Sequence, residues 1–170
     1  MMHATPTQRR PASLRRSWLF TSGLDEHAQQ AALDSCPDVL VADLEEFTAP
    51  DDRPAARPRV TELMARCRAQ GMVAAVRINR LAGDGMLDLR GVMPGAPDAI
   101  FLPYVESSDE IASLAQAIDA LEAELGLPAG STEIVPTIES ALGMVRIQSI
   151  LAASERISAR MLWMRTIPSA

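Results

Sequence analysis

The sequence has few of the residues on which several common functions depend. Only 4% of its 170 residues are aromatic, so base-stacking platforms for a nucleic acid are scarce. The net charge of -6 argues against a nucleic acid or an anionic membrane as the main partner. No apolar run approaches the roughly 20 residues that span a bilayer. We therefore expect neither a nucleic-acid partner nor a membrane partner.

Cysteine and histidine are equally sparse. Cys36 and Cys67 stand alone, without C-x-x-C spacing, and are predicted to be free thiols in a reducing compartment. The cytoplasm is therefore the expected location. His3 and His27 are the only histidines and are expected at the surface, so His-based catalysis and zinc binding have few candidates.

The first sixteen residues contain four arginines and no acidic residue. They also lack the apolar segment of a secretion signal. We expect residues 1–15 to be a basic, disordered leader and residues 16–170 to form one domain. A transit peptide is the alternative for the leader.

The rest of the chain alternates apolar runs with amphipathic segments. Strands are predicted over residues 17–20, 39–44, 73–78, 99–102 and 133–138. Helices are predicted over residues 24–33, 55–70, 107–125 and 140–151, with capping boxes at Ser22-x-x-Asp25 and Ser107-x-x-Glu110. Loops are expected at 83–85 and 94–97. This order predicts an α/β fold with a parallel sheet, and the strands lack period-2 alternation because helices cover them.

Polar residues follow four of the predicted strands. In parallel α/β folds the functional groups gather where strands end, at one edge of the sheet. We therefore expect these residues to form a polar cluster on one side of the domain. They are Asp43, Glu45 and Glu46, then Arg77 and Asn79, then Pro103, Tyr104 and Glu106, and finally Glu139.

These strand ends carry a resemblance to a known family. The matching stretches are Leu19-Phe20-Thr21-Ser22-Gly23, Asp43-Leu44-Glu45-Glu46 with Ala49-Pro50 and Arg53-x-x-x-Arg57, Val76-Arg77-Ile78-Asn79, Leu102-Pro103-x-Val105-Glu106-Ser107, and Ile138-Glu139-Ser140-Ala141. In this order and spacing the sequence resembles the citrate lyase beta-subunit family, within the HpcH/HpaI-type aldolases and acyl-CoA lyases. Each motif alone is weak, but five in order are fairly specific.

The resemblance implies a fold, a reaction and a set of site residues. The family forms a (β/α)8 TIM-type barrel, binds Mg2+, and cleaves or forms carbon–carbon bonds in citryl, malyl, citramalyl or related thioesters of CoA or an acyl carrier. It implies that Arg77 binds the carboxylate of the keto acid, because a guanidinium offers a planar fork for a carboxylate. Glu139 would be a Mg2+ ligand, and Glu45 would lie beside the metal and orient its waters. Related barrels often form homo-oligomers, and the resemblance leaves the oligomeric state of this chain open.

Each of these residues also has a structural interpretation. Asp43 and Glu46 are more simply explained as caps of the next turn or as partners of Arg53 or Arg57. Arg77 alone would fit a strand-end salt bridge, and Glu139 alone would fit an acid favoured at a helix N-terminus. Ser22 and Gly23 fit either a phosphate-binding turn or a plain helix cap.

The sequence departs from the family pattern in several places. Tyr104 stands where the family has Lys, Arg53 replaces another Lys, and Glu46 replaces Asp. Residues 160–170 no longer follow the pattern, and no Asp or Glu occurs after Glu155, so the family's second carboxylate ligand is missing. We expect a truncated or frame-shifted product that holds five to six of the eight barrel strands.

Three functions remain open on this basis. The leading hypothesis is a Mg2+-dependent carbon–carbon lyase that acts on a thioester and a keto acid. The second is an inactive remnant or an interaction subunit of that family. The third is a phosphoenolpyruvate-utilising barrel enzyme, which would also use Mg2+ and Arg.

Overall fold

Six parallel strands form the sheet of the computed structural model, which describes residues 9–159 and 161–162. The strands lie in sequence order, and each pairs with the next. Their bounds are Trp18–Ser22 (β1), Val39–Asp43 (β2), Val73–Arg77 (β3), Ala99–Leu102 (β4), Glu133–Ile138 (β5) and Met161–Leu162 (β6). This order confirms the α/β barrel-type fold expected from the sequence. The barrel is incomplete, since within the described residues the strand order ends at β6 without returning to β1.

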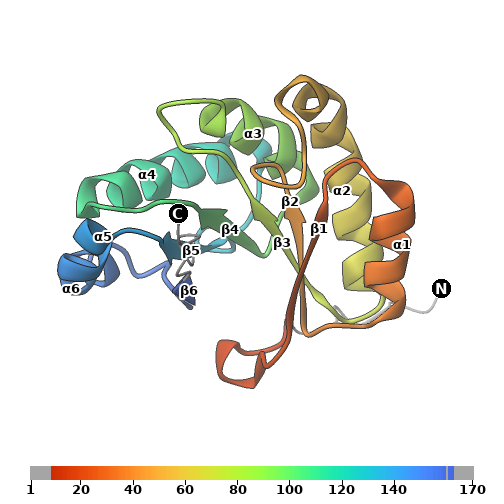
Figure 1. Cartoon of the computed structure of the whole chain (residues 1–170), viewed down its shortest axis with the longest axis horizontal. Coiled ribbons are helices and arrows are strands. Elements are labelled where there is room, and N and C mark those ends of the chain that lie inside the picture. Colours follow the sequence, from red (N-terminus) through yellow and green to blue (C-terminus); the bar gives the residue numbers. More distant parts are fainter. Residues whose placement is uncertain (1–8, 160, 163–170) are drawn as a thin grey trace, which may run out of the picture.

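The helices lie around the outer side of this curved sheet, as Figure 1 shows. They are α1 (Glu26–Asp34), α2 (Arg53–Ala69), α3 (Gly85–Val92), α4 (Ser108–Leu125), α5 (Ala141–Val145) and α6 (Ile147–Leu151). Short 3-10 helices are η1 (Ala12–Leu14), η2 (Pro50–Asp52) and η3 (Met93–Gly95). Each crossover therefore returns the chain to the start of the next parallel strand.

The centre of the sheet is buried on both faces. Every residue of β2, β3 and β4 is buried. Leu40 and Ala42 of β2 belong to the larger core cluster, which the helices cover. Val39 and Val41 belong to a second cluster on the inner face, together with Phe101. Burial on two faces explains why these strands do not alternate between apolar and polar residues.

Most local predictions are confirmed. The strands at Ala99–Leu102 and Glu133–Ile138 have the predicted bounds. The capping box at the start of α4 is present, because Ser107 Oγ accepts a hydrogen bond from the Glu110 N–H and the Glu110 carboxylate accepts one from the Ser107 N–H. Gly126 ends this helix in the left-handed region, at a φ of 66°.

The predicted capping box at Ser22 is wrong. The helix begins at Glu26, and Asp25 is its N-cap, accepting from the Ala28 N–H at 3.0 Å. Ser22 Oγ instead accepts from the N–H groups of Leu24 and Asp25, each at 3.2 Å. Ser22 therefore stabilises the turn before the helix and is not the N-cap of the helix.

Two helical segments differ from the prediction. Residues 83–85 were expected in a loop, but Gly85 begins α3, a helix of 8 residues. The helix was not predicted because glycine has a low helix propensity. The single helix expected over 140–151 is divided into α5 and α6 at Arg146, whose φ of -96° and ψ of 7° leave the helical region. Its N-terminal cap is as expected, since Ser140 Oγ accepts from the Gly143 N–H at 3.1 Å.

Part of the stretch expected to be a disordered leader packs against the sheet. Arg15 is buried, and its Nη1 and Nη2 donate to the Glu133 carboxylate at 2.6 and 2.9 Å. Arg9 Nη1 donates to the carbonyl oxygens of Asp98 and Ser131, each at 2.8 Å. The folded part therefore begins before residue 16, while residues 1–8 of the expected leader lie outside the described residues.

Cys36 is an exposed free thiol and Cys67 a buried one. Burial raises the pKa of the Cys67 thiol to about 11. His27 is exposed on α1, and His3 lies outside the described residues. None of the helices in the described part of the chain combines the length and hydropathy needed to cross a membrane.

Candidate active site

Asp43 ends β2 and organises the loop that follows it. Its side chain is completely buried. Oδ1 accepts from the N–H groups of Glu45 and Glu46 at 2.9 and 3.3 Å, and Oδ2 accepts from the Phe47 N–H at 3.2 Å. Asp43 thus caps the turn, as its structural interpretation predicted.

Arg77 ends β3 and lies opposite Asp43 in the strand register. Its Nε and Nη2 donate to the two Asp43 carboxylate oxygens at 2.9 and 2.5 Å, which makes a buried bidentate pair. Nη2 also donates to Glu46 at 3.2 Å, and Nη1 lies 3.3 Å from Glu45 Oε2. The structural interpretation gave Asp43 two alternatives, a cap of the next turn or a partner of Arg53 or Arg57; the structure shows the cap, and the arginine that binds Asp43 is Arg77.

The Arg77 guanidinium is held between carboxylates and an aromatic ring. Its carbon lies 5.1 Å from the centroid of the Phe20 ring, within cation–π range. Burial alone would lower the pKa of Arg77, but its hydrogen bonds to Asp43 and the charges of Asp43 and Glu45 raise that pKa above its usual value. Arg77 therefore stays charged in this buried position.

Glu45 has an incompletely satisfied carboxylate. Its Oε2 is buried and accepts no hydrogen bond in the structure, although it forms the ion pair with Arg77 Nη1. Burial raises the pKa of Glu45, Arg77 opposes this shift, and the charges of Glu46, Asp43 and Glu139 add to it. An oxygen of this kind is available to a proton, a cation or a ligand.

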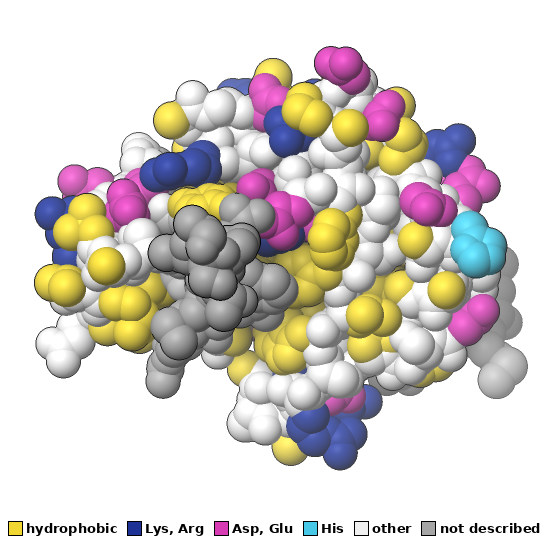
Figure 2. Space-filling view, viewed as in Figure 1, with side chains coloured by type: hydrophobic (Ala, Val, Ile, Leu, Met, Phe, Trp, Pro, Cys, Tyr) yellow, Lys and Arg dark blue, Asp and Glu magenta, His cyan; other side chains and the backbone are white. Residues whose placement is uncertain are grey.

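Glu139 follows β5 and belongs to the same electrostatic neighbourhood. Its charge contributes to the raised pKa of Glu45, although 94 residues separate the two in sequence. It precedes Ser140, the N-cap of α5. The structure therefore brings Glu45, Arg77 and Glu139 to the same ends of β2, β3 and β5. Figure 2 shows acidic and basic side chains together beside an apolar patch on this face of the molecule.

A second buried network lies beside this cluster and was not predicted. Asp88 of α3 is completely buried and accepts from Arg57 Nε at 3.0 Å. It also accepts from the N–H and the Nδ2 of Asn79, at 2.9 and 2.7 Å. Arg53 donates to Asp84 at 3.0 Å. Asn79 and the two arginines thus hold the loop after β3, and no local sequence signal marks Asp88 as the partner of Asn79 and Arg57.

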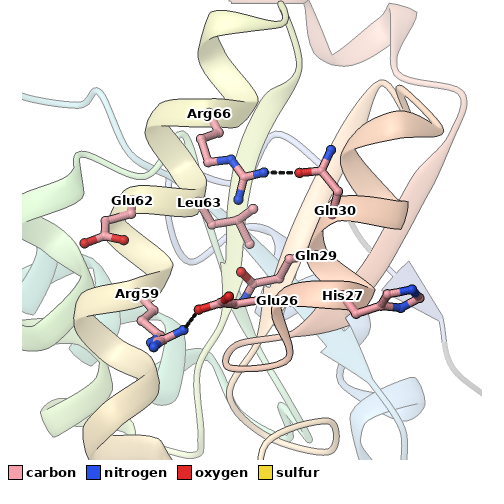
Figure 3. Close-up of a pocket in the computed structure, with 8 residues that line it drawn as sticks. All are labelled: Glu26, His27, Gln29, Gln30, Arg59, Glu62, Leu63 and Arg66. Carbon is pink, nitrogen blue, oxygen red and sulfur yellow. Dashed lines mark hydrogen bonds and ion pairs between the residues drawn. The ribbon is translucent and has the colours of Figure 1, made fainter.

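Two of the hollows in the described surface are lined by several charged side chains, and they differ in position. One of about 400 Å³ adjoins Glu45 at the strand ends. The other, about 420 Å³, lies between α1 and α2 in the outer layer (Figure 3). In this outer hollow Arg59 binds Glu26 and Arg66 binds Gln30. Both arginines of the outer hollow therefore have partners within it, and of these two hollows the one at the strand ends is the one that adjoins Glu45.

The donor atoms at the strand ends suit a hard divalent cation in part. Glu45 offers a buried oxygen without a hydrogen bond, and Glu139 offers a second carboxylate nearby. Among the described residues, no group of three or more His, Cys, Asp or Glu side chains is placed to hold a metal ion. Mg2+ usually keeps several waters and takes only one or two carboxylates from a protein, so two carboxylates fit it as a partial ligand set.

The fold and the position of this polar cluster define a barrel-type α/β protein with its candidate site at the C-terminal strand ends. A family model described as HpcH/HpaI aldolase/citrate lyase matches residues 16–162. The chain belongs to this family, as its strand-end motifs predicted.

Curated relatives carry two related activities in their names. The citrate lyase subunit beta of Haemophilus influenzae is 32% identical over 145 residues, which cover 85% of this chain and 50% of the relative. The L-malyl-CoA/beta-methylmalyl-CoA lyase of Rhodobacter capsulatus is 32% identical over 156 residues, covering 88% of this chain and 48% of the relative. The chain therefore spans about half the length of the curated relatives it matches.

Solved structures support the fold. A citrate lyase from Burkholderia xenovorans has a TM-score of 0.73 at 18% identity, covering 86% of this chain and 48% of that one. The protein CitE from Mycobacterium tuberculosis, in complex with magnesium and acetate, has a TM-score of 0.64 at 25% identity. That similarity covers 89% of this chain and 55% of CitE.

Proposed function

We propose that this chain contributes the site residues of a Mg2+-dependent carbon–carbon lyase. Its substrate would be a citryl-, malyl- or citramalyl-type thioester of CoA or an acyl carrier, cleaved to an acyl thioester and a keto acid. The observation that carries the proposal is the convergence of Glu45, Arg77 and Glu139 at one set of strand ends. The family and the names of its relatives support the reaction class.

Arg77 is proposed to bind the carboxylate of the keto-acid portion. Its Nε and Nη2 are committed to Asp43, which fixes the plane of the guanidinium. The Nη1 edge faces Glu45 and is the edge that a ligand carboxylate can share. Asp43 therefore acts as a positioning residue, and Arg77 keeps a fixed donor for the ligand.

Glu45 is proposed to accept a proton from the substrate and to return it. Cleavage removes the proton of the substrate hydroxyl, converts that carbon to the carbonyl of the keto acid, and leaves the electron pair on the α-carbon of the acyl thioester, which is then protonated. A buried carboxylate with a raised pKa, free of hydrogen bonds at Oε2, suits the acceptance and return of this proton. Burial of the site also limits competition from water.

Glu139 is proposed as the protein's direct ligand to Mg2+, with Glu45 beside it. A bound divalent cation would supply charge stabilisation for the oxygen on which negative charge develops.

The free thiols fit a reducing compartment, so we place the reaction in the cytoplasm.

Titration calorimetry with Mg2+ and pyruvate or glyoxylate tests the proposal. We expect heat from the parent chain, and little or none from Arg77→Ala or Glu139→Ala. Arg59→Ala and Glu62→Ala are matched controls, since both positions line the outer hollow in Figure 3. Parent-like heats from the site variants would contradict the proposal.

A binding protein without turnover is the second candidate. The observation that favours it is the lack of a three-ligand group among the described residues. Release of acetyl-CoA from a malyl or citramalyl thioester supports the lyase. Binding of keto acid without release supports the second candidate, and turnover of phosphoenolpyruvate instead would contradict both.

A further inference from the structure

The hollow beside Glu45 has a wall that the proposed reaction does not use. It measures about 400 Å³ and opens between the loop after β3 and the end of β4. Two guanidinium groups and one aromatic ring face it. Its lining residues are Glu45, Arg53, Asn79, Arg80, Gly83, Asp84 and Tyr104.

Arg80 is the weakly held cation of this hollow. Its side chain is 51% exposed, and its closest acidic partner is Glu110 at 3.6 Å. Arg77, by contrast, is 7% exposed and held by Asp43 at 2.5 Å. An exposed ion pair at such a distance contributes little, so Arg80 can turn toward a ligand at small cost.

Tyr104 gives Arg80 a second contact and a defined position. The guanidinium carbon lies 5.9 Å from the centroid of the Tyr104 ring. Tyr104 itself has a φ of 54°, an uncommon conformation for a bulky residue. The ring therefore forms a platform that keeps the charge of Arg80 over the hollow.

The hollow carries two arginines, Arg53 and Arg80, beside the carboxylates of Glu45 and Asp84. Arg53 is already paired with Asp84, at 3.0 Å, which leaves Arg80 as the cation that a ligand can engage. A ligand that matches this surface has its reacting end at Glu45 and a second anionic group in the hollow.

We propose that this hollow receives a second anionic group of the substrate and that Arg80 is a specificity-determining residue for it. The inference rests on the proposed function, because it takes the reacting end of the substrate to lie at Glu45. The group is a carboxylate or a phosphate, since a guanidinium binds both with the same fork. A second carboxylate would come from a dicarboxylic keto acid such as oxaloacetate, and a phosphate from the phosphopantetheine arm of a thioester.

Calorimetry with two pairs of ligands, in the presence of Mg2+, tests this inference. Oxaloacetate and pyruvate differ by the second carboxylate, and 4'-phosphopantetheine and pantetheine differ by the phosphate. We expect the more highly charged member of one pair to bind more tightly. Arg80→Gln should weaken that ligand about fivefold, as expected for one half-exposed charge contact. Arg59→Gln, an exposed arginine on the outer helix layer, is the charge-matched control and should change nothing.

Two further variants test whether the positive charge itself, rather than the arginine side chain, determines binding. Tyr104→Lys in the Arg80→Gln background returns a cation to the wall of the hollow and should restore part of the affinity. Glu110→Gln removes the competing charge and keeps an oxygen for the capping box, so it should tighten binding.

The outcomes distinguish this inference from the proposed function. Absence of pyruvate and oxaloacetate binding in the parent contradicts the proposed function and this inference with it. Intact pyruvate binding without an Arg80-dependent preference in either pair overturns the inference alone. The pair that shows the preference identifies the source of the anionic group.

Discussion

Asp43→Asn is the sharpest test of how the site is held together. The Asp43 carboxylate accepts five hydrogen bonds, two from Arg77 and three from the backbone of the loop after β2. An Asn side chain offers one acceptor oxygen and turns an N–H donor toward the remaining donors. It also removes the buried charge opposite Arg77.

Breaking a buried ion pair by removing one partner costs about 3–5 kcal/mol. Glu46 at 3.2 Å and Glu45 at 3.3 Å still neutralise Arg77, so we expect the lower end, about 3 kcal/mol. Urea unfolding followed by far-UV circular dichroism measures the loss, with an unchanged m-value. Asp25→Asn is the matched control, since Asn and Asp are equivalent at an exposed N-cap. A loss below about 1 kcal/mol, or one equal to that of the control, would refute the reasoning.

Two further predictions concern stability. Burial alone would raise the pKa of Glu122, but hydrogen bonds from Arg156 and two backbone N–H groups lower it from 4.5 to about 2. The shift corresponds to about 3 kcal/mol of stability that is present above about pH 4.5 and lost as the pH falls toward 2. Glu122→Gln should therefore be less stable than the parent at pH 7 and nearly equal near pH 2 in urea unfolding; a pH-independent gap would contradict this. A Cβ on Gly85 would lie 2.3 Å from the Asn79 carbonyl oxygen, so Gly85→Ala should cost about 1–3 kcal/mol. Gly83→Ala, with its nearest atom at 3.6 Å, should be tolerated, and equal melting temperatures for the two variants would contradict the clash.

The strands and their polar ends were predictable because both are local signals. A run such as Val39–Asp43 is apolar throughout and then acidic, which marks a buried parallel strand and its C-terminal end. Parallel strands bring their C-terminal ends to one edge of the sheet, so the grouping of Glu45, Arg77 and Glu139 followed from the topology. The family resemblance rested on the same residues.

The pairing within that group was not predicted. Asp43 was interpreted as a local cap and Arg77 as a ligand-binding residue, whereas the structure makes them partners across β2 and β3. Val39 pairs with Val73, and this register places Asp43 opposite Arg77. A one-residue shift would move one of the two to the other face of the sheet, and neither strand alone encodes the register.

The other interactions that were not predicted join residues that are far apart in sequence. Asp88 lies in a helix that begins with glycine, and its partner Arg57 is 31 residues away. Arg15 belongs to a segment that composition describes as a basic tail, yet its partner Glu133 is 118 residues away. Composition and periodicity describe residues that are close in sequence, so they do not predict ion pairs between residues that are far apart in sequence.

Three carboxylates pair with the Arg77 guanidinium, and Glu139 adds a fourth negative charge near Glu45, so negative charge is in excess at the strand ends. Asp43 does not contribute to reactivity, because the fold satisfies both of its oxygens. Glu45 keeps a buried oxygen without a hydrogen bond. Burial raises its pKa most, Arg77 opposes this shift, and the neighbouring negative charges add to it. The excess is reduced by a proton on Glu45 or by a cation between Glu45 and Glu139. Both reductions involve Glu45, which is why we propose this carboxylate as the one that accepts and returns the proton.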